Sequence, residues 1–135
     1  QADPFRGSGA VHNPELEMVE ARKNIDFFAN LKAQMWWSLR MRFQNTYRAL
    51  QGMQYDPDAL ISLSTEDLDK RELEQLKREL SQPTYSKNGA GKILVNKQPE
   101  GALSPNRADS VMICFSDTRE RKRKKPAGAG SRTYQ

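Results

Sequence analysis

The sequence contains one cysteine, Cys114, and one histidine. A single cysteine excludes an internal disulfide framework and a cysteine-rich zinc site. Cys114 lies one position from an apolar helix stripe, which predicts a small buried side chain. No apolar run approaches the ~18 residues that a membrane span needs, no signal-like segment opens the chain, and no Gly-x-x-x-x-Gly-Lys-Ser/Thr phosphate-binding loop occurs. We expect a reducing, cytoplasmic setting and no membrane partner.

The chain is also short of apolar residues. Hydrophobic residues make up 36% of its 135 positions, and its mean hydropathy is −0.86. Globular domains usually reach about 45–50% when glycine is counted. We expect that a polar tail accounts for part of this difference, and that the chain is a piece of a larger protein whose remaining core lies outside the sequence.

The excess positive charge is confined to the C-terminal segment. Residues 117–135 carry seven basic and two acidic side chains, whereas the first 116 residues carry fifteen of each. The body of the chain is therefore not a basic DNA-binding surface as a whole. A block of like charge followed by Pro, Ala and Gly residues does not bury enough apolar surface to order itself.

The apolar pattern predicts one long helix over residues 30–50, with Asn30 as its N-cap and Gly52 closing it. A broad apolar face follows the helical repeat, with Trp36 on its flank and Trp37 and Met41 pointing elsewhere. The residues of this face are Met35, Leu39, Phe43, Tyr47 and Leu50. Two apolar patches on one helix predict packing on two sides.

The following segment predicts a second helix and a hairpin. Ser64 is the expected cap of a helix over residues 65–81, which Pro83 ends. Two short strands, residues 84–87 and 92–96, are joined by Asn-Gly-Ala-Gly, a sequence that supplies the positive φ of a tight turn.

A closing helix is predicted to begin at Ser104 and Pro105 and to run to about Arg119. Its apolar stripe consists of Ala108, Val111, Met112 and Phe115. Asp109 lies at the border of this stripe, so its carboxylate is partly desolvated and needs a cation, a donor or a metal. From the residues alone the alternative stays open that Asp109 only interacts with the helix dipole, which stabilises such a carboxylate by about 0.3–1 kcal/mol.

Three stretches, in this order, resemble the large terminase subunits of tailed phages. They are residues 28–40 (FANLKAQMWWSLR), residues 76–85 (LKRELSQPTY, continued by Gly91-Lys92-Ile93) and residues 103–113 (LSPNRADSVMI). The resemblance covers roughly residues 24–117. It implies an α/β fold, namely the C-terminal half of a ribonuclease-H-like nuclease domain, helix-rich with a β-hairpin. The implied domains are a nuclease part over residues 1–118 and a basic flexible tail over residues 119–135.

The resemblance also implies a function. Such proteins are metal-dependent endonucleases that cut concatemeric viral DNA during genome packaging, and their parent protein is also an ATPase. Asp109 is similar to the acid of the family's closing helix, which implies a catalytic role as one ligand of a two-metal Mg²⁺ or Mn²⁺ site. The family's other two acidic clusters have no counterpart here, so the segment alone is expected to be inactive.

The resemblance further implies partners and a location: double-stranded DNA, the portal protein and the small terminase subunit, in the cytoplasm of the host cell. The hairpin lysines Lys87, Lys92 and Lys97 are predicted to contact DNA, with Lys92 the first choice. Lysines on an exposed strand also protect it against aggregation, and this alternative stays open.

The basic tail is predicted to bind DNA electrostatically. Its candidate residues are Arg121, Lys122, Arg123, Lys124 and Lys125. A docking tail for another packaging protein and a merely solubilising end are the alternatives. For the whole chain, the alternative of another class is a non-enzymatic adaptor, in which two amphipathic helices pack together and the basic tail captures nucleic acid or an acidic partner.

Overall fold

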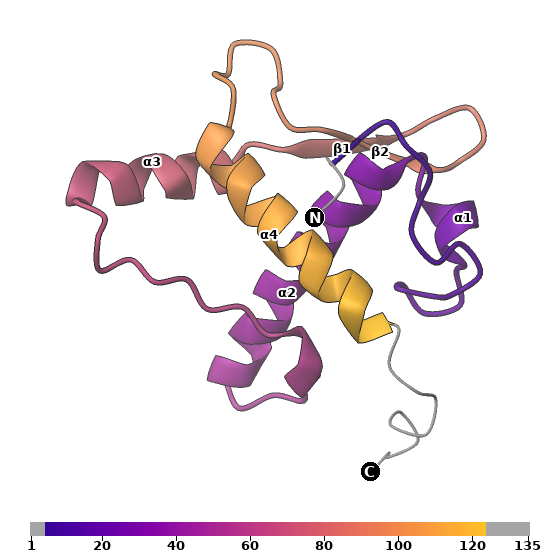
Figure 1. Ribbon diagram of the computed structural model, residues 1–135, viewed down its shortest axis with the longest axis horizontal. Helices are drawn as coiled ribbons and strands as arrows, with labels where there is room; N and C mark the ends of the chain where they lie inside the picture. Colours follow the sequence, from indigo (N-terminus) through magenta and orange to yellow (C-terminus); the bar gives the residue numbers. More distant parts are fainter. Residues whose placement is uncertain (1–4, 124–135) are drawn as a thin grey trace.

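A computed structural model describes residues 5–123 of the chain, and for residues 117–123 it describes the backbone only. A two-stranded antiparallel sheet packs on one long helix, and the last helix of the described chain crosses this long helix (Figure 1). The elements are α1 (Asn24–Phe27), α2 (Leu31–Leu50), a 3₁₀ turn (Pro57–Ala59), α3 (Lys70–Ser81), β1 (Thr84–Lys87), β2 (Ile93–Asn96) and α4 (Asn106–Arg123). No helix of the described part is long and apolar enough to cross a membrane.

The long predicted helix is confirmed as α2. Asn30 caps it by accepting a hydrogen bond from the Ala33 backbone N–H at 2.9 Å, and Gly52 follows it with φ of 74°. The expected apolar face is buried only in the first half of the helix. Tyr47 and Leu50 are 62% and 79% exposed. The 3₁₀ turn packs on the other side of this end of α2, where Asn45 donates to the backbone oxygens of Asp56 and Ala59, and no described element covers the apolar side.

The hairpin is confirmed within one residue, with Thr84 opposite Asn96 and Lys87 opposite Ile93. Asn88 closes the turn, since its side-chain oxygen accepts from the backbone N–H groups of Ala90 and Lys92. Ile93 also forms an isolated parallel bridge with Phe28. The segment before α2 therefore lies beside β2, on the side away from β1.

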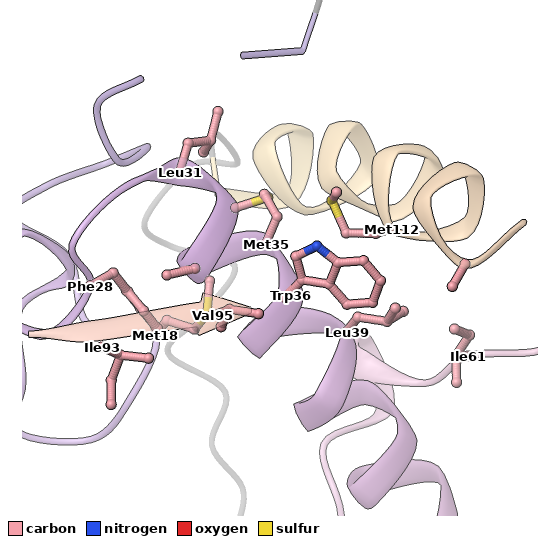
Figure 2. Close-up of a cluster of buried hydrophobic side chains, with 12 residues drawn as sticks. Met18, Phe28, Leu31, Met35, Trp36, Leu39, Ile61, Ile93, Val95 and Met112 are labelled. Atoms are coloured by element: carbon pink, nitrogen blue, oxygen red, sulfur yellow. The ribbon is translucent and has the colours of Figure 1, made fainter. Parts of the chain in front are cut away.

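The core lies where α2, β2 and α4 meet (Figure 2). Met35, Trp36 and Leu39 of α2 pack with Ile93 of β2 and with Met112 of α4. Phe28 and Met18 extend this cluster toward the first residues of the chain. Burial of these side chains fixes the orientation of α4 against α2.

Two predicted helix boundaries are wrong. α3 begins at Lys70 rather than at residue 65, because the residue that caps it is Asp69 and not Ser64. Asp69 forms a reciprocal capping box with Glu72. The backbone of α4 continues to Arg123, four residues past the predicted end. The predicted boundary between a domain and a tail at residue 118 stays a prediction.

Most of the predicted α4 stripe faces the core. Ala108 and Met112 are buried, and Val111 and Phe115 pack against them. Cys114 is exposed, so its predicted burial is wrong. One residue of helix separates Cys114 from the stripe by about 100°, which is enough to turn it away from the core.

Candidate metal-binding carboxylate at the start of α4

Asp109 lies in the first turn of α4, and its side chain is 20% exposed. Its Oδ2 accepts a hydrogen bond from Lys97 Nζ at 2.6 Å. Its Oδ1 is buried and has no hydrogen-bond partner among the described residues. A buried carboxylate oxygen with no donor is costly unless something else supplies positive charge. The predicted partial desolvation of Asp109 is therefore confirmed, and one of its oxygens has no donor among the described residues.

Glu79 of α3 holds the start of α4. Its Oε1 accepts from the backbone N–H groups of Arg107 at 2.8 Å and Ala108 at 3.1 Å. Its Oε2 accepts from the Gln75 side-chain amide at 2.9 Å. A carboxylate from a neighbouring helix thus satisfies two of the N–H groups that a helix leaves unpaired at its first turn. This contact positions the backbone directly before Asp109.

The pKa of Glu79 reflects the same contacts. Burial raises the pKa of its carboxyl, but the hydrogen bonds from Gln75, Ala108 and Arg107 outweigh burial, and the pKa is lowered below the usual 4.5. Glu79 is therefore ionised at neutral pH although it is only 4% exposed. The negative charge of Glu79 lies at the N-terminal end of α4, where the helix dipole is positive, and this interaction stabilises the helix.

A second contact joins α3 and α4. Arg107 donates from Nη2 to Glu72 Oε2 at 3.0 Å. Glu72 is also part of the capping box that starts α3. The beginnings of the two helices are therefore linked through Arg107 and Glu72. Glu79 links the two helices again, about two turns further along α3.

The described residues contain no group of three or more His, Cys, Asp or Glu side chains suited to hold a metal. Asp109 fits the role of a single ligand, because its unpaired oxygen is the hard donor that Mg²⁺, Mn²⁺ or Ca²⁺ prefers. Further carboxylates have to come from outside the described part of the chain for a complete site to form.

The three hairpin lysines occupy different places. Lys97 follows β2 and contacts Asp109. Lys87 and Lys92 lie at the turn end of the hairpin, which Figure 1 shows at the opposite end of the sheet from the start of α4. Five residues of extended chain separate Lys92 from Lys97, a distance of roughly 17 Å. The DNA contacts predicted for these lysines stay predictions.

The basic tail residues lie at or beyond the edge of the described structure. The backbone of Arg121, Lys122 and Arg123 is helical, and their side chains are outside the description. Lys124 and Lys125 lie outside the described residues.

Comparison with family models and with curated proteins finds no match. Among solved structures, the nuclease domain of the large terminase subunit gp2 of bacterial virus Sf6 matches with a TM-score of 0.73 and 34% sequence identity, over 82% of this chain and 51% of that chain. The fold is that of part of a phage large-terminase nuclease domain. The resemblance predicted from the sequence is thereby confirmed, and this chain spans about half the length of the solved domains it matches.

Two further structures of the same terminase domain, both of a lysine-to-alanine variant, contain metals. One holds manganese and β-thujaplicinol and matches with a TM-score of 0.73, and one holds calcium and matches with 0.71; each shows 34% identity over 82% of this chain and 51% of that chain. The match favours the nuclease prediction over the adaptor alternative.

The role of Glu79 was not predicted from the sequence. Glu79 lies three residues after Leu76 and one before Leu80, so it borders the apolar side chains of its helix as Asp109 borders the α4 stripe. The same border argument applied to α3 identifies Glu79 as a partly desolvated acid that needs donors.

Proposed function

We propose that this chain is part of the metal-dependent DNA endonuclease of a phage terminase large subunit, and that Asp109 is one of its metal ligands. The observation that carries this proposal is the unpaired, buried Oδ1 of Asp109 at a helix start that Glu79 and Glu72 of α3 hold through Arg107. The match to a terminase nuclease domain supports the choice of chemistry.

A bound Mg²⁺ or Mn²⁺ pair supplies an activated water and stabilises the leaving oxygen in phosphodiester cleavage. The residues of this chain have three separate tasks. Asp109 provides one oxygen ligand, Glu79 positions the turn that carries it, and Lys97 balances its negative charge. Lys97 is 33% exposed at its side chain, so its ammonium is accessible to a DNA phosphate at the same place.

The remaining ligands belong to the portion of the domain that this chain does not include. We therefore propose that the segment alone does not cut DNA, and that the parent protein combines this nuclease with an ATPase. Its proposed partners are double-stranded DNA, the portal protein and the small terminase subunit, in the cytoplasm of the host cell. Backbone contacts rather than base contacts account for cleavage at many sequences.

Nicking of supercoiled plasmid by the parent protein with Mn²⁺ tests the proposal. We expect Asp109→Ala to lose at least a hundredfold in nicking rate, and a variant of an exposed loop acid, Asp67→Ala, to retain the rate of the unsubstituted protein. Equal nicking by the Asp109→Ala variant and the unsubstituted protein contradicts a ligand role for Asp109.

The proposed DNA contact of the basic tail has its own test. Truncation of the parent protein after Thr118 removes seven basic side chains. We expect weaker DNA binding and a shallower dependence of affinity on salt, because each neutralised phosphate contributes about 0.9 to that slope. An unchanged affinity and slope after truncation contradict the proposed arm.

A further inference from the structure

Lys97 contacts Asp109 from the loop that joins β2 to α4. Figure 1 shows this loop, residues 97–105, projecting beyond the start of α4. A hydrogen bond within the loop supports its shape, because the Gln98 side chain donates to the Ala102 backbone oxygen at 3.3 Å. Such a bond does not determine where the loop lies on the rest of the chain, and contacts from another element have that role.

Gln82 joins the loop to the end of α3. Its side-chain nitrogen Nε2 donates to the backbone oxygen of Lys97 at 2.8 Å and to that of Leu103 at 2.9 Å. An amide nitrogen has two hydrogens, so both of its donors are used. Both partners are carbonyl oxygens, which only accept, so the amide oxygen of Gln82 cannot replace its nitrogen at this place. One side chain therefore holds the two ends of the loop together.

A proline explains why a side chain supplies this donor. The backbone pairing of the hairpin ends at Thr84 opposite Asn96. One further step of the same register places Pro83 opposite Lys97, and proline has no backbone N–H to donate. Gln82 is the C-cap residue of α3, directly before this proline. Its amide therefore holds the Lys97 backbone where the backbone ladder has ended.

The last turn of α3 thus supports both partners of the pair that Lys97 forms with Asp109. Glu79 accepts from two backbone N–H groups at the start of α4 and holds the turn that carries Asp109. Gln82 lies three residues after Glu79 and holds the backbone of Lys97. Side chains three residues apart lie on the same face of a helix, so one end of α3 positions the carboxylate and the ammonium together.

The contact between Lys97 and Asp109 depends on where the lysine backbone lies. The ammonium and the carboxylate are 2.6 Å apart, and the two side chains are 33% and 20% exposed. A partly exposed pair gains little from charge attraction and loses side-chain freedom, and lysine has a flexible four-carbon stem. A backbone already held in place lowers the cost of ordering this side chain.

We infer that Gln82 is a positioning residue of the metal site, which holds Lys97 on Asp109 Oδ2 and so determines how readily a divalent cation binds this carboxylate. Gln82 acts through Lys97 rather than by a contact with Asp109. When the Gln82 amide is removed, the ammonium leaves Oδ2 more often and the cation meets less competition. The inference rests on the proposed role of Asp109 as a metal ligand.

A double-mutant cycle on the 135-residue chain tests the inference, with Mn²⁺ as the probe and Gln82→Met and Lys97→Met as the substitutions. Methionine is close to glutamine in size and has no N–H. The measured quantity is the Mn²⁺ concentration that half-broadens the NMR signals of the residues around Asp109. We expect this concentration to fall about threefold in Gln82→Met, and the double variant to match Lys97→Met, because two residues that act through one contact are not additive.

A second measurement needs no metal. Hydrogen exchange reports how often a bonded group opens to water, and the exchange of the Lys97 ammonium is followed by NMR on the chain with labelled lysine. Gln82→Met is expected to speed this exchange about threefold, because the pair with Asp109 opens more often.

Gln98→Met is the matched control, since it removes a hydrogen bond of the same loop that does not reach α3. We expect it to leave both measurements unchanged. Gln82 is partly exposed, so its replacement is expected to leave the chain folded, and circular dichroism verifies this for every variant.

Three results overturn the inference. If Gln82→Met lowers stability but changes neither measurement, Gln82 has a structural role only, and the proposed ligand role of Asp109 stands. An equal effect of Gln82→Met with and without Lys97→Met means that Gln82 does not act through the lysine. If Asp109→Ala leaves the broadening by Mn²⁺ unchanged, the metal binds elsewhere, and the proposed function is contradicted together with the inference.

Discussion

The start of α4 and the end of α2 differ in how completely other side chains of this chain contact them. At the start of α4, Glu79, Arg107 and Lys97 form a polar network that restrains the backbone around Asp109. At the end of α2, Tyr47 and Leu50 face solvent. The first region is fixed in place and leaves one carboxylate oxygen unpaired. The second exposes large apolar side chains that no described element covers.

Among substitutions at the start of α4, Glu79→Ala is expected to lower the stability of the chain most. The substitution leaves the N–H groups of Arg107 and Ala108 without their acceptor, and each unsatisfied buried group costs about 1–3 kcal/mol. We expect the free energy of unfolding to fall by about 3 kcal/mol, measured by urea denaturation. Glu74→Ala, on the exposed side of the same helix, is the control and is expected to change stability by less than about 0.5 kcal/mol. Equal effects of the two substitutions contradict the role of Glu79.

The pH dependence of stability follows from the lowered pKa of Glu79. Because the unfolded chain binds this proton more readily, the contribution of Glu79 is complete above the unfolded pKa near 4.5 and is lost as the pH falls through the lowered folded pKa. Stability is expected to fall more steeply below pH 4.5 in the unsubstituted chain than in Glu79→Gln. Parallel curves from urea denaturation at several pH values contradict the assignment.

Lys97→Met changes the polar region less. The pair with Asp109 is partly exposed, so the expected loss of stability is about 1 kcal/mol or less. Removal of the ammonium frees Asp109 Oδ2 and removes a competing cation. We expect Mn²⁺ to broaden the NMR signals of the residues around Asp109 at a several-fold lower concentration than in the unsubstituted chain. Lys87→Met, at the other end of the hairpin, is the control and leaves this concentration unchanged. Identical broadening in all three proteins contradicts direct competition at Asp109.

The smallest effect is expected at the end of α2. Tyr47→Gln removes an aromatic ring that contributes little to the core, so thermal unfolding is expected to report a change within about 0.5 kcal/mol. Met35→Ala, on the buried half of the same helix, is expected to cost about 2–5 kcal/mol. If Tyr47→Gln lowers the free energy of unfolding by 1.5 kcal/mol or more, this end of α2 is packed in solution. Such a result contradicts the difference between the two regions.

Local signals predicted the elements of this fold well. The Asn30 cap and the Asn-Gly turn act over a few residues, and α2 and the hairpin form where the sequence places them. The start of α3 was misplaced because Ser64 and Asp69 are both favoured cap residues, and the reciprocal pair of Asp69 and Glu72 is the one that starts the helix. The exposure of Tyr47 and Leu50 at the end of α2 was not predictable from periodicity, since an apolar helix face indicates a surface that packs without indicating what covers it.

The candidate site was predictable only in part. The helix position of Asp109 indicated a desolvated carboxylate, and the structure places Lys97 against it. Glu79 lies 28 residues before Arg107, and a contact across that separation depends on the packing of α3 on α4, which no local pattern encodes.

The most direct test of the account is the location of manganese in crystals of the complete nuclease domain of this protein, found by anomalous scattering. We predict an anomalous peak at about 2.1 Å from Asp109 Oδ1, a distance typical of small divalent cations bound to oxygen. Manganese held by other carboxylates, with Asp109 still paired to Lys97 and outside coordinating distance, contradicts the account.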